Sequence, residues 1–339
     1  MTELHTKEFE KSTFYKTGDD VYLRLFCPSC NMKLKAIDEV FGHSQSCPSC
    51  KGEFTVPEPA VFCGQRVKRF QVDGLVGMGA NGQVYAAHDV DAVENDIVLK
   101  IATSDIISDQ LVKFFKQEFT RLKKLDHPSI VKTFGCGHNE NYYYFAMSRV
   151  NGETFTQLQQ RHEILAEKLV AHAIIQVAEA MDYAWDLNNT VHGDLKPDNL
   201  MLNDQGQVFV MDWGYSQVLK PGDEQDLIDE VNGTPLFLAP ELVRGERISN
   251  AQEDIYSLGV TCYVLLTGEY PFLGEDIQEL FDNIREAPIE TVRELNPDVS
   301  RQMEIVVSKM MAREKKNRYQ DWKEVLVDMI PFLNRYNFQ

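Results

Sequence analysis

A carboxylate, an ammonium group and a carboxamide lie close together in the segment 192–199, which reads HGDLKPDN. They belong to Asp194, Lys196 and Asn199, and a second carboxylate, Asp212, follows thirteen residues after Asn199. One carboxylate can orient a hydroxyl group and accept its proton, while the lysine can neutralise a phosphate in transit. The amide and the second carboxylate offer the oxygen ligands that Mg²⁺ prefers. These residue types at this spacing suit phosphoryl transfer.

The two segments HGDLKPDN and DWG resemble the catalytic loop and the metal-binding turn of the Hanks-type protein kinases, which usually read HRDLKxxN and DFG. The resemblance implies that Asp194 accepts the proton of the substrate hydroxyl and that Lys196 stabilises the transferring phosphoryl group. It also implies that Asn199 and Asp212 hold Mg²⁺, for which Mn²⁺ could substitute. A lysine at the place of Lys196 resembles the Ser/Thr-specific branch. The expected reaction is transfer of the γ-phosphate of ATP to Ser and Thr hydroxyls of proteins.

A glycine-rich segment lies upstream, between two segments that read as strands, Val67–Val76 and Val84–His88. A strand–turn–strand of this kind resembles the family's loop over the ATP phosphates, where glycine lets the backbone approach closely. The resemblance implies nucleotide binding by Gly77, Met78, Gly79, Ala80, Asn81, Gly82 and Val84. The alternatives are a glycine-rich hairpin without a ligand and a dinucleotide-binding turn, which needs a helix directly after the glycines.

One ammonium group interrupts the apolar segment Ile97–Ala102, which is predicted to be a buried strand. Lys100 resembles the VAIK lysine that holds the ATP phosphates, but it lies eighteen residues past the last glycine. A loop insertion is therefore expected around residues 90–96. A buried lysine needs a partner, and apolar residues at helical spacing over residues 114–122 surround Glu118. Glu118 matches the family's partner of this lysine; the alternative is a surface charge.

An apolar strand is predicted at Tyr142–Ala146, and the sequence turns polar after Met147. This pattern resembles the hinge between the two lobes of the kinase family, with Met147 in the gatekeeper position. Backbone groups near Ser148 and Val150 are then expected to bind adenine. Leu202, which follows the catalytic loop, is expected to form the floor under the adenine.

Further matches to the family concern the scaffold of the site. Glu241, in the sequence APE, is expected to form a buried ion pair with Arg318, and Asp254 is expected to hold the backbone of the catalytic loop. Thr234 resembles the threonine of the substrate-docking turn. A long amphipathic helix is predicted over Leu165–Leu187, leading to the catalytic loop.

The sequence departs from the family at Gly193, where an arginine usually stands. In the family that arginine pairs with a phosphorylated residue of the activation segment. The segment between Gln217 and Gly233 contains no Ser, Thr or Tyr, although it contains five acidic residues. Both the phosphate acceptor and its receiver are thus missing, which predicts activity without phosphorylation of this segment (the non-RD type). The acidic run by itself also fits a solvated loop.

Two Cys-x-x-Cys turns precede the glycine-rich segment, and sixteen residues separate them. Four thiolates at this spacing predict a structural zinc site with no open position for catalysis, formed by Cys27, Cys30, Cys47 and Cys50. The alternatives are a redox pair and unbonded thiols, and His43 could replace one cysteine as a ligand. The segment resembles a zinc ribbon, whose function could be to dock a partner or to regulate the following domain.

Length, composition and net charge limit the partners and locations that this chain can have. The chain has 339 residues, 43% of them apolar, and a formal net charge of −18, so it is expected to bind neither nucleic acid nor an anionic membrane surface. No segment reaches the roughly 18 consecutive apolar residues that span a bilayer. The first ten residues lack the apolar core of a signal peptide. An odd number of cysteines with clustered pairs favours metal in a reducing compartment, and a cytoplasmic location is expected.

The sequence therefore predicts an α+β protein with a small zinc ribbon before a two-lobed protein-kinase fold, similar in organisation to bacterial members. The expected parts are a polar segment at 1–20, the ribbon at 21–58, a linker at 59–66, the β-rich lobe at 67–147, the hinge at 148–152 and the helical lobe at 153–339. The alternatives are a pseudokinase scaffold that binds nucleotide, an adaptor that acts through its ribbon, and a small-molecule kinase of similar fold.

Overall fold

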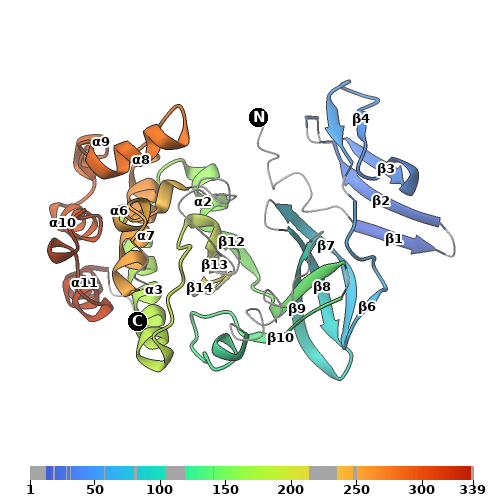
Figure 1. Cartoon of the computed structure of the whole chain (residues 1–339), viewed down its shortest axis with the longest axis horizontal. Coiled ribbons are helices and arrows are strands. Elements are labelled where there is room, and N and C mark those ends of the chain that lie inside the picture. The colour runs from blue at the N-terminus through green and yellow to red at the C-terminus, as the bar shows by residue number, and fades with distance from the viewer. Residues whose placement is uncertain are drawn as a thin grey trace. The chain divides into compact units, whose positions relative to one another are not determined.

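The computed structural model describes residues 13–336 except for 18–19, 28, 31, 57, 80–81, 104–118, 140, 214–234 and 247–249. The chain divides into two compact units, of which the first comprises Met1–Lys123 and Lys132–Arg149. The second comprises Lys124–Val131 and Val150–Gln339. The later boundary falls between Arg149 and Val150, inside the residues for which the sequence predicts a hinge. Unit 1 is built mainly of strands and unit 2 mainly of helices (Figure 1), which agrees with the predicted α+β organisation.

The largest sheet described in unit 1 is antiparallel and six-stranded, in the order β10-β11-β9-β8-β7-β6. Its strands are β6 (Arg66–Val67), β7 (Phe70–Gly79), β8 (Gly82–Asp89), β9 (Ala92–Thr103), β10 (Thr133–His138) and β11 (Tyr142–Ser148). The predicted strands Val84–His88, Ile97–Ala102 and Tyr142–Ala146 lie within β8, β9 and β11. The predicted strand Val67–Val76 is divided instead, because β6 ends at Val67 and β7 begins at Phe70, with Lys68 at a φ of 56° between them. Long side chains on one face of the sheet belong to a hydrophobic core, which sets the register of the strands.

The loop insertion expected around residues 90–96 is wrong. Strand β9 begins at Ala92, so only Val90 and Asp91 connect it to β8. The Asp89 carboxylate accepts a hydrogen bond from the backbone N–H of Asp91 at 3.0 Å, which stabilises a tight turn. The residues that make the separation between Gly82 and Lys100 long therefore extend the β8–β9 hairpin instead of forming a loop.

The cysteine-containing segment also belongs to unit 1. A three-stranded antiparallel sheet contains β1 (Thr13–Thr17), β2 (Asp20–Phe26) and β3 (Lys33–Ile37), followed by the short helix η2 (Asp38–Val40). A hairpin follows, with strands β4 (Ser44–Ser46) and β5 (Glu53–Thr55). Strand β1 lies within residues 1–20, where the sequence predicts no element. Its residues are mostly polar, so the pairing with β2 leaves little trace in the apolar pattern.

Unit 2 contains one small sheet and a set of helices. The sheet has β12 (Gly152–Thr154), β13 (Leu200–Asn203) and β14 (Val208–Val210). The longer helices are α2 (Phe155–His162), α3 (Glu167–Asn188), α7 (Ala251–Thr267), α8 (Ile277–Glu286), α10 (Arg301–Met310) and α11 (Trp322–Tyr336). The short ones are η3 (Pro197–Asn199), η4 (Pro235–Phe237), α6 (Pro240–Val243), α9 (Val292–Leu295) and η5 (Lys315–Asn317).

Helices α3 and α7 form the centre of unit 2. Helix α3 matches the predicted amphipathic helix to within two residues at its start and one at its end. Helix α7 is buried on almost every side, as a helix without a polar face must be, and the Asn250 side chain caps its N-terminus. Within the described residues, no helix combines the length and the apolar character needed to cross a membrane.

Candidate active site

The catalytic loop is held in place by a buried carboxylate on α7. The backbone N–H groups of His192 and Gly193 donate to the two oxygens of Asp254, at 2.6 and 2.7 Å. The Thr261 hydroxyl, two turns farther along α7, donates to the backbone carbonyl of Leu195 at 3.2 Å. A two-oxygen acceptor that faces two successive amides fixes the direction of the chain. The prediction that Asp254 holds the backbone of the catalytic loop is confirmed.

Asp194, Lys196 and Asn199 form one hydrogen-bonded group. Asp194 Oδ2 accepts from Lys196 Nζ at 2.8 Å and from Asn199 Nδ2 at 2.9 Å. Asn199 Nδ2 also donates to the Asp194 backbone carbonyl at 2.7 Å. No hydrogen bond to Asp194 Oδ1 is found within the described residues. One oxygen of this carboxylate is therefore fixed by its neighbours, and the other can receive a proton.

The residues expected to hold Mg²⁺ are placed by the same loop. Both hydrogens of the Asn199 amide are directed to Asp194, so its Oδ1 is the atom left for a cation. The Met211 N–H donates to the Asn199 carbonyl at 2.9 Å, which places Asp212 directly beyond that contact. Asp212 adopts a φ of 56°, an uncommon value for a residue with a side chain. A carbonyl and a carboxylate oxygen are a suitable donor set for Mg²⁺.

Two aromatic residues support this arrangement. His192 is fully buried: its Nδ1 accepts from the Asp194 N–H at 3.2 Å, and its Nε2 donates to the Met211 carbonyl at 2.6 Å. Its place at the head of the loop is visible in the sequence, but its structural role is not. Trp213 replaces the family's usual phenylalanine and packs against the His192 ring, with 5.1 Å between ring centroids. Its Nε1 donates to the Val210 carbonyl at 3.1 Å, so the buried indole is satisfied.

Unit 1 contains the residues expected to contact the ATP phosphates. Lys100 is buried on β9, and the register pairs it with Val84 on β8, so both side chains lie on one face of the sheet. The glycine-rich segment is the turn of the β7–β8 hairpin, with Gly77, Gly79 and Gly82 in the strands. A strand follows the glycines, which excludes the dinucleotide-binding alternative. Ala80, Asn81 and Glu118 lie outside the described residues, and so does the side chain of Met78.

The residues expected near adenine are divided between the two units. Met147 and Ser148 end β11, where Met147 pairs with Val98 of β9. The Ser148 N–H donates to the Lys132 carbonyl at 2.8 Å, so this N–H is not available to adenine. Val150 opens the second part of unit 2, and Leu202 lies half-buried on β13. The structure places each of these residues within its own unit.

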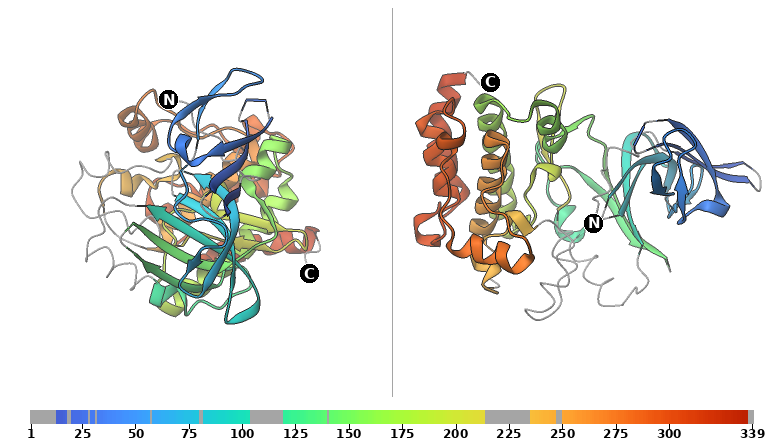
Figure 2. Two further views of the ribbon diagram at one scale, coloured as in Figure 1. Left: turned by 90° about the vertical axis from the view of Figure 1, so that its right-hand side faces the viewer. Right: turned by 90° about the horizontal axis from the view of Figure 1, so that it is seen from above.

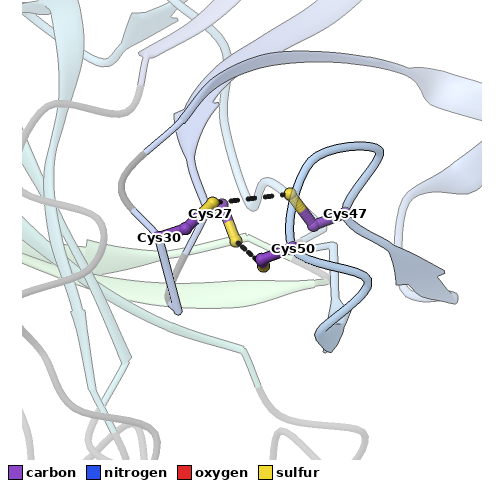
Figure 3. A group of neighbouring side chains, drawn as sticks. All are labelled: Cys27, Cys30, Cys47 and Cys50. Atoms are coloured by element: carbon purple, nitrogen blue, oxygen red, sulfur yellow. Dashed lines mark hydrogen bonds between the residues drawn. The ribbon is translucent and has the colours of Figure 1, made fainter.

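The four cysteines form a compact cluster (Figure 3). The sulfur atoms of Cys27 and Cys50 are 3.6 Å apart, those of Cys30 and Cys47 are 3.7 Å apart, and all four lie within 4.8 Å of one another. Four thiolates at about 2.3 Å from a central zinc ion would form a tetrahedron with edges of about 3.8 Å. The pKa of Cys47 is lowered to about 6, chiefly by a hydrogen bond from the Cys50 N–H. The pKa of Cys50 is raised to about 11: a hydrogen bond from the Gly52 N–H opposes the rise, and the neighbouring thiols and burial outweigh it. The cluster fits a tetrahedral metal site.

A buried ion pair supports the region beyond the catalytic loop. Arg318 donates to both oxygens of Glu241, at 2.8 and 3.1 Å, and both side chains are almost fully buried. The guanidinium of Arg318 also lies over the Tyr256 ring, 5.0 Å from its centroid. The predicted ion pair between Glu241 and Arg318 is confirmed. The acidic run of the activation segment and Thr234 lie outside the described residues.

Comparison with known proteins agrees with these features. A model of the protein kinase domain family matches residues 70–328. The chain is 30% identical to Serine/threonine-protein kinase PknB of Mycolicibacterium smegmatis over 269 residues, which are 77% of this chain and 42% of that protein. It is 28% identical to Serine/threonine-protein kinase PrkC of Bacillus subtilis over 271 residues, 79% of this chain and 41% of that protein. The chain thus spans about two fifths of the length of these relatives. It belongs to the protein kinase domain family.

Proposed function

We propose that this chain is a Ser/Thr protein kinase that transfers the γ-phosphate of ATP to hydroxyl groups of proteins, with Mg²⁺ as cofactor. The observation that carries the proposal is the group formed by Asp194, Lys196 and Asn199, clamped by Asp254. Membership of the protein kinase domain family and the names of the bacterial relatives support it. Among the alternatives, a pseudokinase would need no carboxylate held ready to accept a proton.

The chemistry follows from the orientation of the side chains. The substrate oxygen forms a bond to the γ-phosphorus while its proton passes to Asp194 Oδ1, and the bond from phosphorus to the bridging oxygen breaks to release ADP. Lys196 Nζ, held by Asp194 Oδ2 at 2.8 Å, stabilises the charge on the transferring group. Asn199 Oδ1 and the Asp212 carboxylate would hold Mg²⁺. When bound, Mg²⁺ neutralises charge on the phosphates. Lys100 and Val84 of unit 1 would contact the nucleotide.

The class of acceptor can be tested directly. The purified protein should transfer label from γ-labelled ATP to itself and to a generic basic protein in the presence of Mg²⁺. Acid hydrolysis of the labelled protein should yield phosphoserine and phosphothreonine, because Lys196 resembles the Ser/Thr-specific branch. Label recovered only on small molecules would favour a small-molecule kinase, and labelled tyrosine would contradict the assignment.

We further propose that activity does not require phosphorylation of the activation segment. Gly193 stands where the family usually has an arginine, and residues 218–232 contain no Ser, Thr or Tyr. Gly193 adopts a φ of 78°, a conformation that glycine reaches without strain. Protein treated with a phosphatase is therefore expected to keep its full activity.

The cysteine cluster is proposed to be a structural zinc site in a cytoplasmic protein. Bound zinc would supply four Zn–S bonds that tie the Cys27–Cys30 turn to the Cys47–Cys50 turn. The ribbon is also a candidate docking surface, because Met32 and Ile37 expose apolar side chains on it. If docking is its function, a Met32→Ser/Ile37→Ser variant should lose partner binding and keep phosphoryl transfer.

A further inference from the structure

The strand after the glycine-rich turn has two faces with different surroundings. Its partner β9 lies alongside in antiparallel register, so directly opposed residues point to the same side of the sheet. Val84 pairs with Lys100, and both belong to the face assigned to the nucleotide. Tyr85 pairs with Leu99 on the opposite face, and Gln83 lies on that face as well. A segment that packs on this second face can therefore influence the position of β8 without contacting the nucleotide.

The opposite face is covered by the cysteine-containing ribbon and by the connector that follows it. One hydrophobic cluster contains buried residues from the ribbon, the connector and the sheet, among them Leu23, Leu25, Ala36, Val56, Val61, Tyr85, Leu99 and Ile101. In the right-hand view of Figure 2 the dark blue ribbon strands lie beside the cyan strands of the six-stranded sheet. Because the ribbon shares this core, its packing stabilises the six-stranded sheet.

Gln83 makes the polar contacts of this interface. Its Nε2 donates to the Glu58 carbonyl at 2.6 Å, and its Oε1 accepts from the Ala60 N–H at 2.8 Å. The Tyr85 hydroxyl also donates to Gln83 Oε1, and it accepts from the Val61 N–H at 3.4 Å. Two neighbouring side chains of β8 thus bind successive backbone groups of the connector. A single glutamine used as both donor and acceptor fixes the strand in position and direction.

Gly82, the first residue of β8, is packed closely against β9. Gly82 directly precedes Gln83 and has a φ of 114°. A Cβ added to Gly82 would lie 2.3 Å from the Ile101 carbonyl oxygen, so the end of the turn is packed tightly against β9. Gln83 therefore directly follows a glycine that lies close against the backbone of β9.

We propose that Gln83 is a positioning residue for ATP: by binding the connector at residues 58–60 it holds the start of β8, directly after the glycine-rich turn, in the position that favours nucleotide binding. The inference rests on the proposed kinase function. Its physical basis is preorganisation, because a strand that is fixed before binding loses less conformational freedom when ATP binds. The ribbon and its connector then act on nucleotide affinity without touching the nucleotide.

The test compares two variants of Gln83 with a matched control. Gln83→Met keeps the length of the side chain and removes its hydrogen bonds, and Gln83→Ala removes both length and hydrogen bonds. Gln71→Ala is the control, since Gln71 lies on the neighbouring strand β7 and its Nε2 donates to the Gly64 carbonyl at 2.6 Å. Titration calorimetry gives the Kd for ATP, and steady-state kinetics give KM and kcat.

Both Gln83 variants should raise the Kd and the KM for ATP about three- to tenfold, as expected for the loss of two hydrogen bonds that favour the bound conformation. The kcat should change by less than about twofold, because the phosphoryl-transfer residues are intact. Hydrogen exchange of residues 74–86 in the free protein should be faster in Gln83→Met and unchanged in Gln71→Ala.

Two results would overturn the inference. The first is a wild-type Kd for ATP in Gln83→Met, with transfer activity preserved, which would leave the kinase assignment intact. The second is an equal loss of ATP affinity in Gln71→Ala, which would indicate general loosening of the sheet. A wild-type protein that binds no ATP would overturn both the inference and the proposed kinase function.

Discussion

Asp194 shows how a common residue type acquires one chemical role. Its Oδ2 accepts from Lys196 and Asn199, and its backbone lies in a loop whose amides are bound by Asp254. The orientation of Asn199 follows from the same contacts, because both of its amide hydrogens bind Asp194. Residue types and spacing predicted this group. The use of each oxygen could not be predicted, since it depends on distances that the sequence does not contain.

His192 illustrates the opposite case at the same scale. It is fully buried and connects the catalytic loop to the Met211 carbonyl, next to Asp212. A histidine next to catalytic residues can be an acid, a base, a ligand or a structural donor, and the sequence does not distinguish these. Only burial and the two hydrogen bonds show that this one is a structural donor.

Glu253 provides a pH-dependent prediction. Burial on α7 raises its pKa to about 8, with further contributions from Asp254 and Glu241, while Lys315 and Arg318 oppose the rise. Its Oε1 has no hydrogen-bond partner within the described residues. The folded state keeps the proton longer than the unfolded state, so this group should make the free energy of unfolding fall as pH rises from about 4.5 to 8.

Glu253→Gln should remove that pH dependence. Relative to wild type, we expect the variant to gain about 1–2 kcal/mol between pH 5 and pH 8, a value reduced from the full shift to allow for solvent screening. Urea unfolding at the two pH values measures it. Glu179→Gln, at an exposed position of α3, should show no such gain. Equal pH dependence in wild type and Glu253→Gln would contradict the account.

At the scale of elements, strands β7, β8, β9 and β11 and helix α3 could be predicted from the apolar pattern. Strand β1 could not, because its residues Thr13–Thr17 carry little apolar pattern. The contact between the ribbon and the sheet could not be predicted from the sequence either. The pattern of Leu99 and Ile101 shows that one face is buried, but it does not say which segment buries it.

The cysteine cluster gives a prediction at the same scale. The purified protein should contain about one zinc ion per chain, and Cys30→Ser should lose most of it, because the proposed zinc site needs four ligands. The melting temperature should also fall, by about 5 °C or more, because the ribbon shares a core with the sheet. Metal analysis and calorimetry measure the two effects.

Cys63→Ser is the matched control for this experiment. Cys63 lies outside the cluster, with its sulfur donating to the Asp73 carbonyl at 2.9 Å, so its replacement should leave the zinc content unchanged. Wild-type protein without zinc, or equal zinc content in wild type and Cys30→Ser, would show that the four thiols are not a metal site.

For the molecule as a whole, the sequence predicts one β-rich and one helical part, and the structure has both. The family match covers residues 70–328, so the ribbon lies outside it. The net charge of −18 is compatible with basic protein substrates, although it also serves solubility. The ribbon is therefore the part of the described chain that the family model does not match, and Gly193 departs from the arginine that the family usually has in the catalytic loop.

The most direct test of the central claim is phosphoryl transfer by phosphatase-treated protein. Wild type, Asp194→Asn and Asp198→Asn are compared with γ-labelled ATP, Mg²⁺ and a basic acceptor protein. Asp198 is an exposed carboxylate on the same loop and serves as the matched control. We expect wild type and Asp198→Asn to transfer label at similar rates and Asp194→Asn to be slower by about 10²–10⁴-fold, with ATP affinity retained. Equal rates in Asp194→Asn and wild type, or a wild type that binds ATP and transfers nothing, would contradict the account.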